Sequence, residues 1–357
     1  MTIAKRRIAF ERTETPPAWI RTLIPVLALV ITFILTSTLI LWGKANPFEA
    51  YYYFLIAPLS SRVSALEVLV KSTPLILAGV AVTFAFVAGY YNIGAEGQLY
   101  AGAIAAAWLG VVLGGLPAVL AIPLMVLGGF LAGLAWAVVP ALLRVRLAVD
   151  EVVTTLLLNS IMLYIVSALL NGPWRDPQSG WPQSPEIAPS TVFPQLVPRS
   201  RLNLGFIMAL LSVAVLWFIL SRTGFGLKMR AVGSGKPAAR FAGVSVERTT
   251  LIAALVSGGI AGVAGVAEVA GIQFHLIGDL SPGYGYTGII IATLGALNPI
   301  GVGAAGLFFG LIDTGTQTVS RALGVPVYLG EVTQATMLLV TLAIFLLQGY
   351  RIRIRRS

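Results

Sequence analysis

About ten stretches of some twenty mainly apolar residues run through this chain, and they constrain its fold more than any other feature. A helix of that length matches the hydrocarbon core of a bilayer. The chain is 57% hydrophobic and 11% charged, whereas a soluble domain is about a quarter charged. The sequence therefore predicts an all-α integral membrane protein with about ten transmembrane helices, some of them broken or re-entrant. The stretches lie near 20–43, 67–89, 94–114, 116–139, 152–170, 204–221, 249–267, 286–303, 304–320 and 331–348.

Basic residues gather in alternate connecting segments. One set of segments holds 17 Lys and Arg and the other holds seven. The positive-inside rule then places both termini in the cytoplasm. We expect a multi-pass protein of the bacterial inner membrane. We expect a cytoplasmic tail over 1–19, a transmembrane domain over 20–350 and a basic tail over 351–357. The net charge of +10 does not indicate nucleic-acid binding, because it flanks apolar stretches.

Two connecting loops are distinctive. The segment 171–203 is rich in proline, which removes backbone donors, so it cannot be a spanning helix. It is expected outside the cell, as an ordered cap or docking surface or as a plain solvated linker. The segment 222–248 is the longest and most basic cytoplasmic loop, and its glycines break the backbone into turns. A short helix over Lys236–Ala242 is expected there, either to contact another protein or as part of a positive anchor.

The stretch GYYNIGAEGQLYAG at 89–102 is the most informative. It places Asn92, Glu96 and Gln98 in an apolar region, where a carboxylate costs about 2.5–3.5 kcal/mol. Its glycines allow a helix to break and expose backbone groups to a cavity. We therefore expect a broken helix that lines a solute path. The alternative is a short cytoplasmic turn with Glu96 in water.

A second glycine-rich stretch, 278–301, precedes another apolar run. Its glycines at 283, 285 and 288 match the spacing of a dinucleotide fingerprint, but that fingerprint needs a preceding strand and an acidic partner, and here the glycines open a membrane span. The two stretches lie in the two halves of the chain, which indicates an internal structural repeat. Other polar residues in apolar surroundings are Asn159, Glu268, Gln273, Asp313 and Gln317, and for each of them a helix–helix hydrogen bond or interfacial solvation is the alternative to a substrate contact. The predicted solute pathway consists of Asn92, Glu96, Gln98, Asn159, Tyr286 and Thr287.

Several chemistries are not supported by the sequence. Gly233-Ser234-Gly235-Lys236 fails the phosphate-binding loop pattern, because Arg230 stands where its first glycine belongs and Pro237 follows the lysine. With no cysteine and one histidine, we expect no metal site, no cofactor and no catalytic constellation. Four GxxxG pairs, at 110/114, 129/133, 258/262 and 306/310, predict close helix packing.

The segments NIGAEGQ at 92–98, AVGSGKPAARFAGV at 231–244 and GYGYTGIIIATLGALNPIG at 283–301 resemble those of a known family. The chain is similar to the membrane permeases of ABC importers for simple sugars and nucleosides. It resembles most the longer permease of nucleoside importers that use a basic-membrane-protein-type binding lipoprotein. The resemblance covers most of 65–350. The third motif departs from the family at Ala296, where a basic residue is usual.

This resemblance implies a non-enzymatic function, import of nucleosides or related ribose and sugar solutes. It implies three protein partners: a second, homologous permease in a heterodimer, an ATPase with two nucleotide-binding domains and an extracytoplasmic binding lipoprotein. The 231–244 segment would be the coupling helix that docks on the ATPase. The matching positions are Gly233, Ala238, Ala239, Arg240, Phe241 and Gly243.

Two other classes of function compete with this interpretation. An ion-coupled secondary transporter of a small polar solute also uses broken helices and a buried carboxylate. It would not need the basic cytoplasmic loop with its short helix. An integral membrane enzyme would need catalytic residues that the sequence does not offer. The choice among purine nucleosides, pyrimidine nucleosides, free bases and sugars stays open.

Overall fold

The computed structural model describes residues 6–12, 18–324, 326–348 and 350–356. The chain forms two compact units. Unit 1 consists of Met1–Phe54 and Gly315–Ser357, and unit 2 of Leu55–Thr314. Helix α12 (Pro299–Leu323) runs from unit 2 into unit 1.

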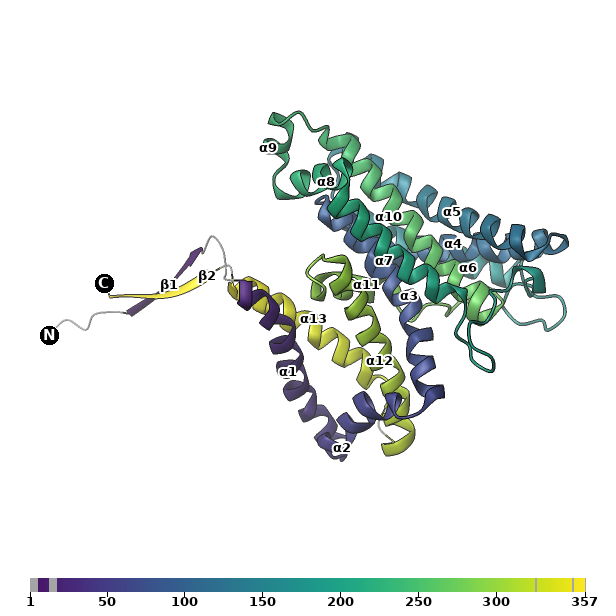
Figure 1. Cartoon of the computed structure of the whole chain (residues 1–357), viewed down its shortest axis with the longest axis horizontal. Coiled ribbons are helices and arrows are strands. Elements are labelled where there is room, and N and C mark those ends of the chain that lie inside the picture. Colours follow the sequence, from purple (N-terminus) through teal and green to yellow (C-terminus); the bar gives the residue numbers. More distant parts are fainter. Residues whose placement is uncertain (1–5, 13–17, 325, 349, 357) are drawn as a thin grey trace. The chain divides into compact units, whose positions relative to one another are not determined.

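Unit 1 joins the two ends of the chain. Strand β1 (Arg6–Arg12) pairs antiparallel with β2 (Tyr350–Arg356), with Arg6 opposite Arg356 (Figure 1). Helix α1 (Ala18–Trp42) packs against α13 (Leu329–Gln348). The short helix α2 (Pro47–Tyr51) follows α1 and begins at Asn46, whose side chain accepts the Phe48 N–H. The terminal segments were expected as tails, so the β ribbon is an addition to the all-α class, which describes the other elements.

Unit 2 is a helical bundle with α10 (Val246–Glu268) at its centre. Helix α10 contacts α3 (Arg62–Val87), α4 (Ala95–Val112) and α5 (Ala118–Leu147). Helices α6 (Glu151–Asn171) and α7 (Leu204–Arg222) complete the long helices, and α11 (Tyr284–Leu294) packs on α3. The short helices α8 (Gly224–Ser234) and α9 (Lys236–Phe241) lie at one end of the unit (Figure 1).

Glycine pairs set the close packing of this bundle. A Cβ on Gly102 would lie 2.1 Å from the Gly262 carbonyl oxygen, and one on Gly133 would lie 2.2 Å from that of Gly258. The backbones of α4, α5 and α10 therefore touch directly. The other predicted pairs also sit at contacts, since Gly110 meets Ile187 and Gly306 meets Ile76. The packing role predicted for the GxxxG pairs is confirmed.

Six helical segments in the described part of the chain are long and apolar enough to cross a membrane. They are Arg62–Val87, Ala95–Gly115, Ala118–Leu147, Glu151–Asn171, Leu204–Arg222 and Val246–Gln273, with two shorter apolar helices at Val30–Trp42 and Tyr284–Leu294. A multi-pass membrane protein follows from them. The division expected between 286–303 and 304–320 is wrong. Helix α11 ends at Leu294, the backbone turns through Ala296 and Leu297 at φ of 52° and 56°, and α12 begins at Pro299.

The proline-rich loop 171–203 is folded onto unit 2 rather than solvated throughout. Backbone hydrogen bonds join Ser184 to Leu276, Ile187 to Phe274 and Phe193 to Ala270. Within the loop, the Ser179 hydroxyl and the Gln178 N–H donate to Asp176 and lower the pKa of its carboxyl to about 2. The loop is thus an ordered cap over the end of α10, which excludes the plain-linker alternative.

Candidate functional site

The segment between α3 and α4 turns back into the bundle. The chain reverses at Gly89, where φ is +69°. Tyr90 and Asn92 are then fully buried, whereas Tyr91 between them is exposed. The Asn92 amide donates to the Ser257 hydroxyl at 2.9 Å, and that hydroxyl donates to the Ala81 carbonyl at 2.6 Å. Because Ala81 lies inside α3 and Ser257 inside α10, the segment is held between these two helices.

Asparagine and glutamine side chains build the start of α4. The Asn92 amide donates to the Gln98 carbonyl oxygen at 2.8 Å, and the Asn92 carbonyl oxygen accepts the Gly94 N–H at 2.9 Å. From α6, Asn159 accepts the Gly97 N–H and donates to the Ile93 carbonyl, each at 2.9 Å. These bonds satisfy backbone groups that the start of a helix leaves unpaired.

Glu96 joins the starts of α4 and α11. Its Oε2 accepts the Gly285 N–H at 2.7 Å, and it also interacts with the Ser281 side chain and the Gly283 backbone. The side chain is 3% exposed and forms no ion pair within the described residues. A Cβ on Gly285 would lie 2.2 Å from the Glu96 backbone nitrogen. Two helix N-termini, each with positive partial charge, therefore meet at one buried carboxylate.

We call this region the junction: residues 92–98, residues 281–287 and Asn159. It contains all six residues of the predicted pathway. Tyr286 accepts a hydrogen bond from the Asn159 amide at 3.1 Å, and the buried Thr287 donates its backbone N–H to Gly283. The alternative of a cytoplasmic turn with Glu96 in water is wrong, since Glu96 is buried.

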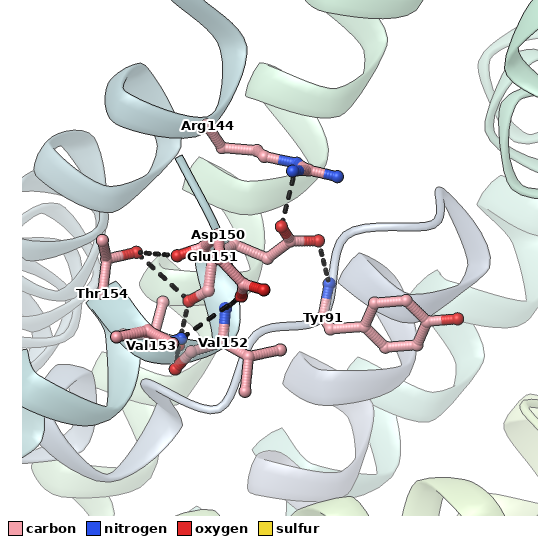
Figure 2. Close-up of polar contacts among 8 residues, drawn as sticks. Tyr91, Arg144, Asp150, Glu151, Val152, Val153 and Thr154 are labelled. Atoms are coloured by element: carbon pink, nitrogen blue, oxygen red, sulfur yellow. Dashed lines mark hydrogen bonds and ion pairs between the residues drawn. The ribbon is translucent and has the colours of Figure 1, made fainter. Parts of the chain in front are cut away.

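Sequence reasoning missed the residues that hold the junction from other helices. Ser257 and Thr155 were unremarkable serine and threonine positions in helices, although Thr155 accepts the Ile93 N–H. Figure 2 shows a further missed contact, in which Glu151 lies between Arg144 and Tyr91. The Arg144 Nε lies 2.8 Å from the Glu151 carboxylate, and the Tyr91 N–H points to the same group at 3.4 Å. This ion pair fixes the base of the segment between α3 and α4 to α5 and α6.

The predicted coupling segment forms the expected short helix, α9. Ala239 is buried against Val232 and Val246, whereas Phe241 is 96% exposed. Ala238 and Gly243 are exposed, and Arg240 pairs with Glu247 at 3.3 Å on the surface. Ala239 thus packs α9 against its own chain, whereas the Phe241 ring has little contact with the rest of the chain.

Gly233 brings this segment into contact with the turn between α3 and α4, which precedes the junction. A Cβ there would lie 2.2 Å from the Val87 carbonyl oxygen and 3.4 Å from the Gly89 nitrogen, so only glycine permits the contact. Gly89 is the turn that leads to Asn92. The end of α8 therefore rests on the segment that enters the junction. Among the described residues, no group of three or more His, Asp and Glu is placed to hold a metal ion.

Comparison with known proteins shows that this chain is similar to permease components of transport systems. Residues 64–347 match the family described as "Branched-chain amino acid transport system / permease component". A glucose ABC transporter permease protein of Haloferax volcanii is 36% identical over 97% of this chain and 94% of its own length. A guanosine ABC transporter permease protein of Bacillus subtilis is 34% identical over 80% and 82%. A nucleoside ABC transporter permease protein of Lactococcus lactis is 30% identical over 92% of each.

Proposed function

We propose which solutes this chain carries and what drives their transport, on the premise that it belongs to the family of branched-chain amino acid transport system permease components. It is a membrane-spanning permease subunit of an ABC importer. We infer that its solutes are nucleosides or related ribose- and sugar-bearing compounds. The observation that carries this inference is the similarity, at 30–36% identity, to permeases for guanosine, nucleosides and glucose.

The junction is the proposed control point of the solute path. Its polar groups are satisfied by one another and by the starts of α4 and α11, so they fix the geometry of two broken helices. A permease needs only weak contact with its solute, because the binding protein supplies affinity and release must be easy. Glu96 is accordingly proposed to hold the junction in shape by accepting backbone N–H groups.

The proposed partners are an ATPase with two nucleotide-binding domains, a second homologous permease in a heterodimer and an extracytoplasmic binding lipoprotein. Ala239 fixes α9 to its own chain, whereas Phe241 on the same helix is exposed, and this exposed ring supports the ATPase contact. The contact of Gly233 with the α3–α4 turn supplies a physical link from that surface to the junction. An ion-coupled carrier would have no use for this surface.

The proposed topology has about ten crossings, with both termini and 222–248 in the cytoplasm of the inner membrane. Its support is the split of 17 to seven basic residues. Pairing of β1 with β2 also brings the two ends of the chain together within unit 1. The inverted placement of α4 and α11, with their starts meeting at Glu96, is consistent with the proposed repeat.

Single introduced cysteines test this orientation, since the chain has none of its own. We expect a cysteine at the exposed Ser234 to resist a membrane-impermeant maleimide in intact cells and to react after permeabilisation. A cysteine at the exposed Glu186, in the loop 171–203, should react in intact cells and serves as the control. Labelling of position 234 from outside would refute the topology.

The solute class is tested by uptake through the whole importer. We expect labelled guanosine to be taken up and an excess of unlabelled nucleoside to compete with it. Glucose and leucine are the comparison solutes, since the first is carried by a relative and the second fits the family description. Uptake of leucine with neither guanosine nor glucose would contradict the proposed substrate class.

A further inference from the structure

A polar cavity of about 240 Å³ lies in unit 2 away from α8 and α9. It is formed by α3, the end of the loop 171–203, the end of α10 and the loop before α11. The polar side chains that line it are Lys71, Arg201, Glu268, Gln273, Asp279 and Tyr284. It is separate from the six pathway residues of the junction. Its volume lies below the range of about 300–1,000 Å³ for drug-sized ligands, so it suits a small solute or one ring of a larger solute.

Within the described part of the chain, Glu268 in this cavity has no hydrogen bond and no close ion pair, although Lys71 and Arg201 lie within electrostatic range of it. The side chain is 5% exposed, yet among the described residues no hydrogen bond or ion pair to its carboxylate is found. Buried carboxylates are normally paired or hydrogen-bonded, because desolvation without compensation is costly. Glu96, equally buried, shows the ordinary case, since it accepts the Gly285 N–H. The Glu268 carboxylate is therefore available for donors that a ligand would bring.

The two cations of the cavity are already engaged. Lys71 lies 3.2 Å from Asp313, and Arg201 pairs with Glu67. When their partners Asp313 and Glu67 are counted with Glu268 and Asp279, four acidic side chains lie in or beside the cavity against two basic ones. An anionic solute such as a sugar phosphate is disfavoured there.

The chemistry of the lining selects hydroxyl donors. The carbonyl-type oxygens of a carboxyl group accept hydrogen bonds, so they suit a ligand that supplies O–H or N–H groups. Tyr284 adds an aromatic side chain to the lining. We propose that this cavity binds a neutral polyhydroxylated ring, either a free sugar or the ribosyl part of a nucleoside, with Glu268 and Asp279 accepting hydrogen bonds from its hydroxyl groups. This inference rests on the proposed solute class.

The cavity and the junction share two residues, Pro282 and Tyr284. Tyr284 lines the cavity and begins α11, and the next residue, Gly285, donates to Glu96. Tyr284 also lies within electrostatic range of both Glu268 and Glu96. A ring bound in the cavity would thus contact the first residue of the helix that the junction holds.

Protection of an introduced cysteine tests the site directly. Gln273→Cys, in the purified full-length chain in lipid nanodiscs, is treated with a small maleimide. We expect ribose, glucose or guanosine to slow its modification saturably, and glucose 6-phosphate to have no effect. Glu186→Cys, on the exposed loop outside the cavity, should react at one rate throughout.

The near-isosteric substitution Glu268→Gln tests whether the Glu268 carboxylate binds the ring. In the Gln273→Cys chain we expect it to raise the half-protecting concentration about tenfold or more, as loss of charged hydrogen bonds does. Glu186→Gln should leave that concentration unchanged. Size-exclusion profiles of the variants establish that they are folded.

The outcomes separate the two sources of the ring. Protection by guanosine alone indicates the ribosyl group of a nucleoside, and protection by the free sugars alone indicates a sugar. Modification at an unchanged rate with every solute, or protection by the sugar phosphate, would overturn the cavity assignment. So would protection that Glu268→Gln leaves intact. The uptake assay decides the substrate class independently, so a failed cavity and a failed function are distinguishable.

Discussion

Replacement of Glu96 by alanine is expected to reduce nucleoside uptake to background, while Glu96→Gln keeps part of it. Alanine leaves the Gly285 N–H, now buried at a helix start, without its acceptor. An unsatisfied buried group costs about 1–3 kcal/mol, or about ten- to hundredfold in the population of the correct geometry. Glutamine keeps one carbonyl oxygen for Gly285 and loses only the charge and the second acceptor.

The assay for Glu96 is uptake of labelled guanosine by the whole importer, with the amount of permease in the membrane measured in parallel. Glu186→Ala, on the exposed loop 171–203, is the matched control and should transport normally. Transport by Glu96→Ala at the wild-type rate would contradict the role of the junction. Complete loss in Glu96→Gln, with normal abundance, would show that the charge itself is needed in each cycle.

Phe241→Ala is expected to separate the permease from its ATPase without unfolding it. The ring is 96% exposed, so its removal leaves no cavity in this chain. Truncation of an aromatic anchor at an interface typically costs about 2 kcal/mol or more, which is about thirtyfold in affinity. Retention of the ATPase on affinity-purified permease should fall accordingly, and uptake should fall with it.

The control for Phe241 is Tyr164→Ala. Tyr164 is also a large exposed aromatic residue, at 76%, but it lies on the membrane helix α6. Its truncation should not change ATPase retention. Equal retention and uptake in Phe241→Ala and wild type would show that α9 does not dock on the ATPase.

Local chemistry made part of the site predictable from sequence. Asn92, Glu96 and Gln98 stand out because polar groups at membrane depth are costly and glycines beside them permit a broken helix. The partner of Glu96 could not be found in that way, because Gly285 lies 189 residues further along the chain and offers only its backbone. A glycine in the sequence gives no indication that its backbone N–H binds a distant carboxylate.

The cavity around Glu268 escaped prediction for a related reason. Each of its charged residues is a single polar position in an apolar or loop segment, and each alone is explained by a helix contact. Lys71 and Asp313 do form such a contact, at 3.2 Å. Only the fold brings Glu268 and Asp279 to the lining of one cavity.

For two elements of the fold, the prediction from hydropathy disagreed with a local sequence signal that was correct. The sequence YRIRIRR at 350–356 alternates apolar and basic residues with the period of a strand, but its charge suggested only a cytoplasmic tail. Asn298-Pro299 is a turn signal, and α12 begins at that proline. The span-length criterion instead placed the division inside α12.

The energy source of uptake tests the central claim most directly. Proteoliposomes would contain this chain with its partner permease and ATPase, and the binding protein would be supplied outside. We predict accumulation of labelled guanosine that requires hydrolysable ATP in the lumen and continues when ionophores collapse every ion gradient. Accumulation by this chain alone, driven by an ion gradient without the ATPase, would contradict the account and identify a secondary transporter.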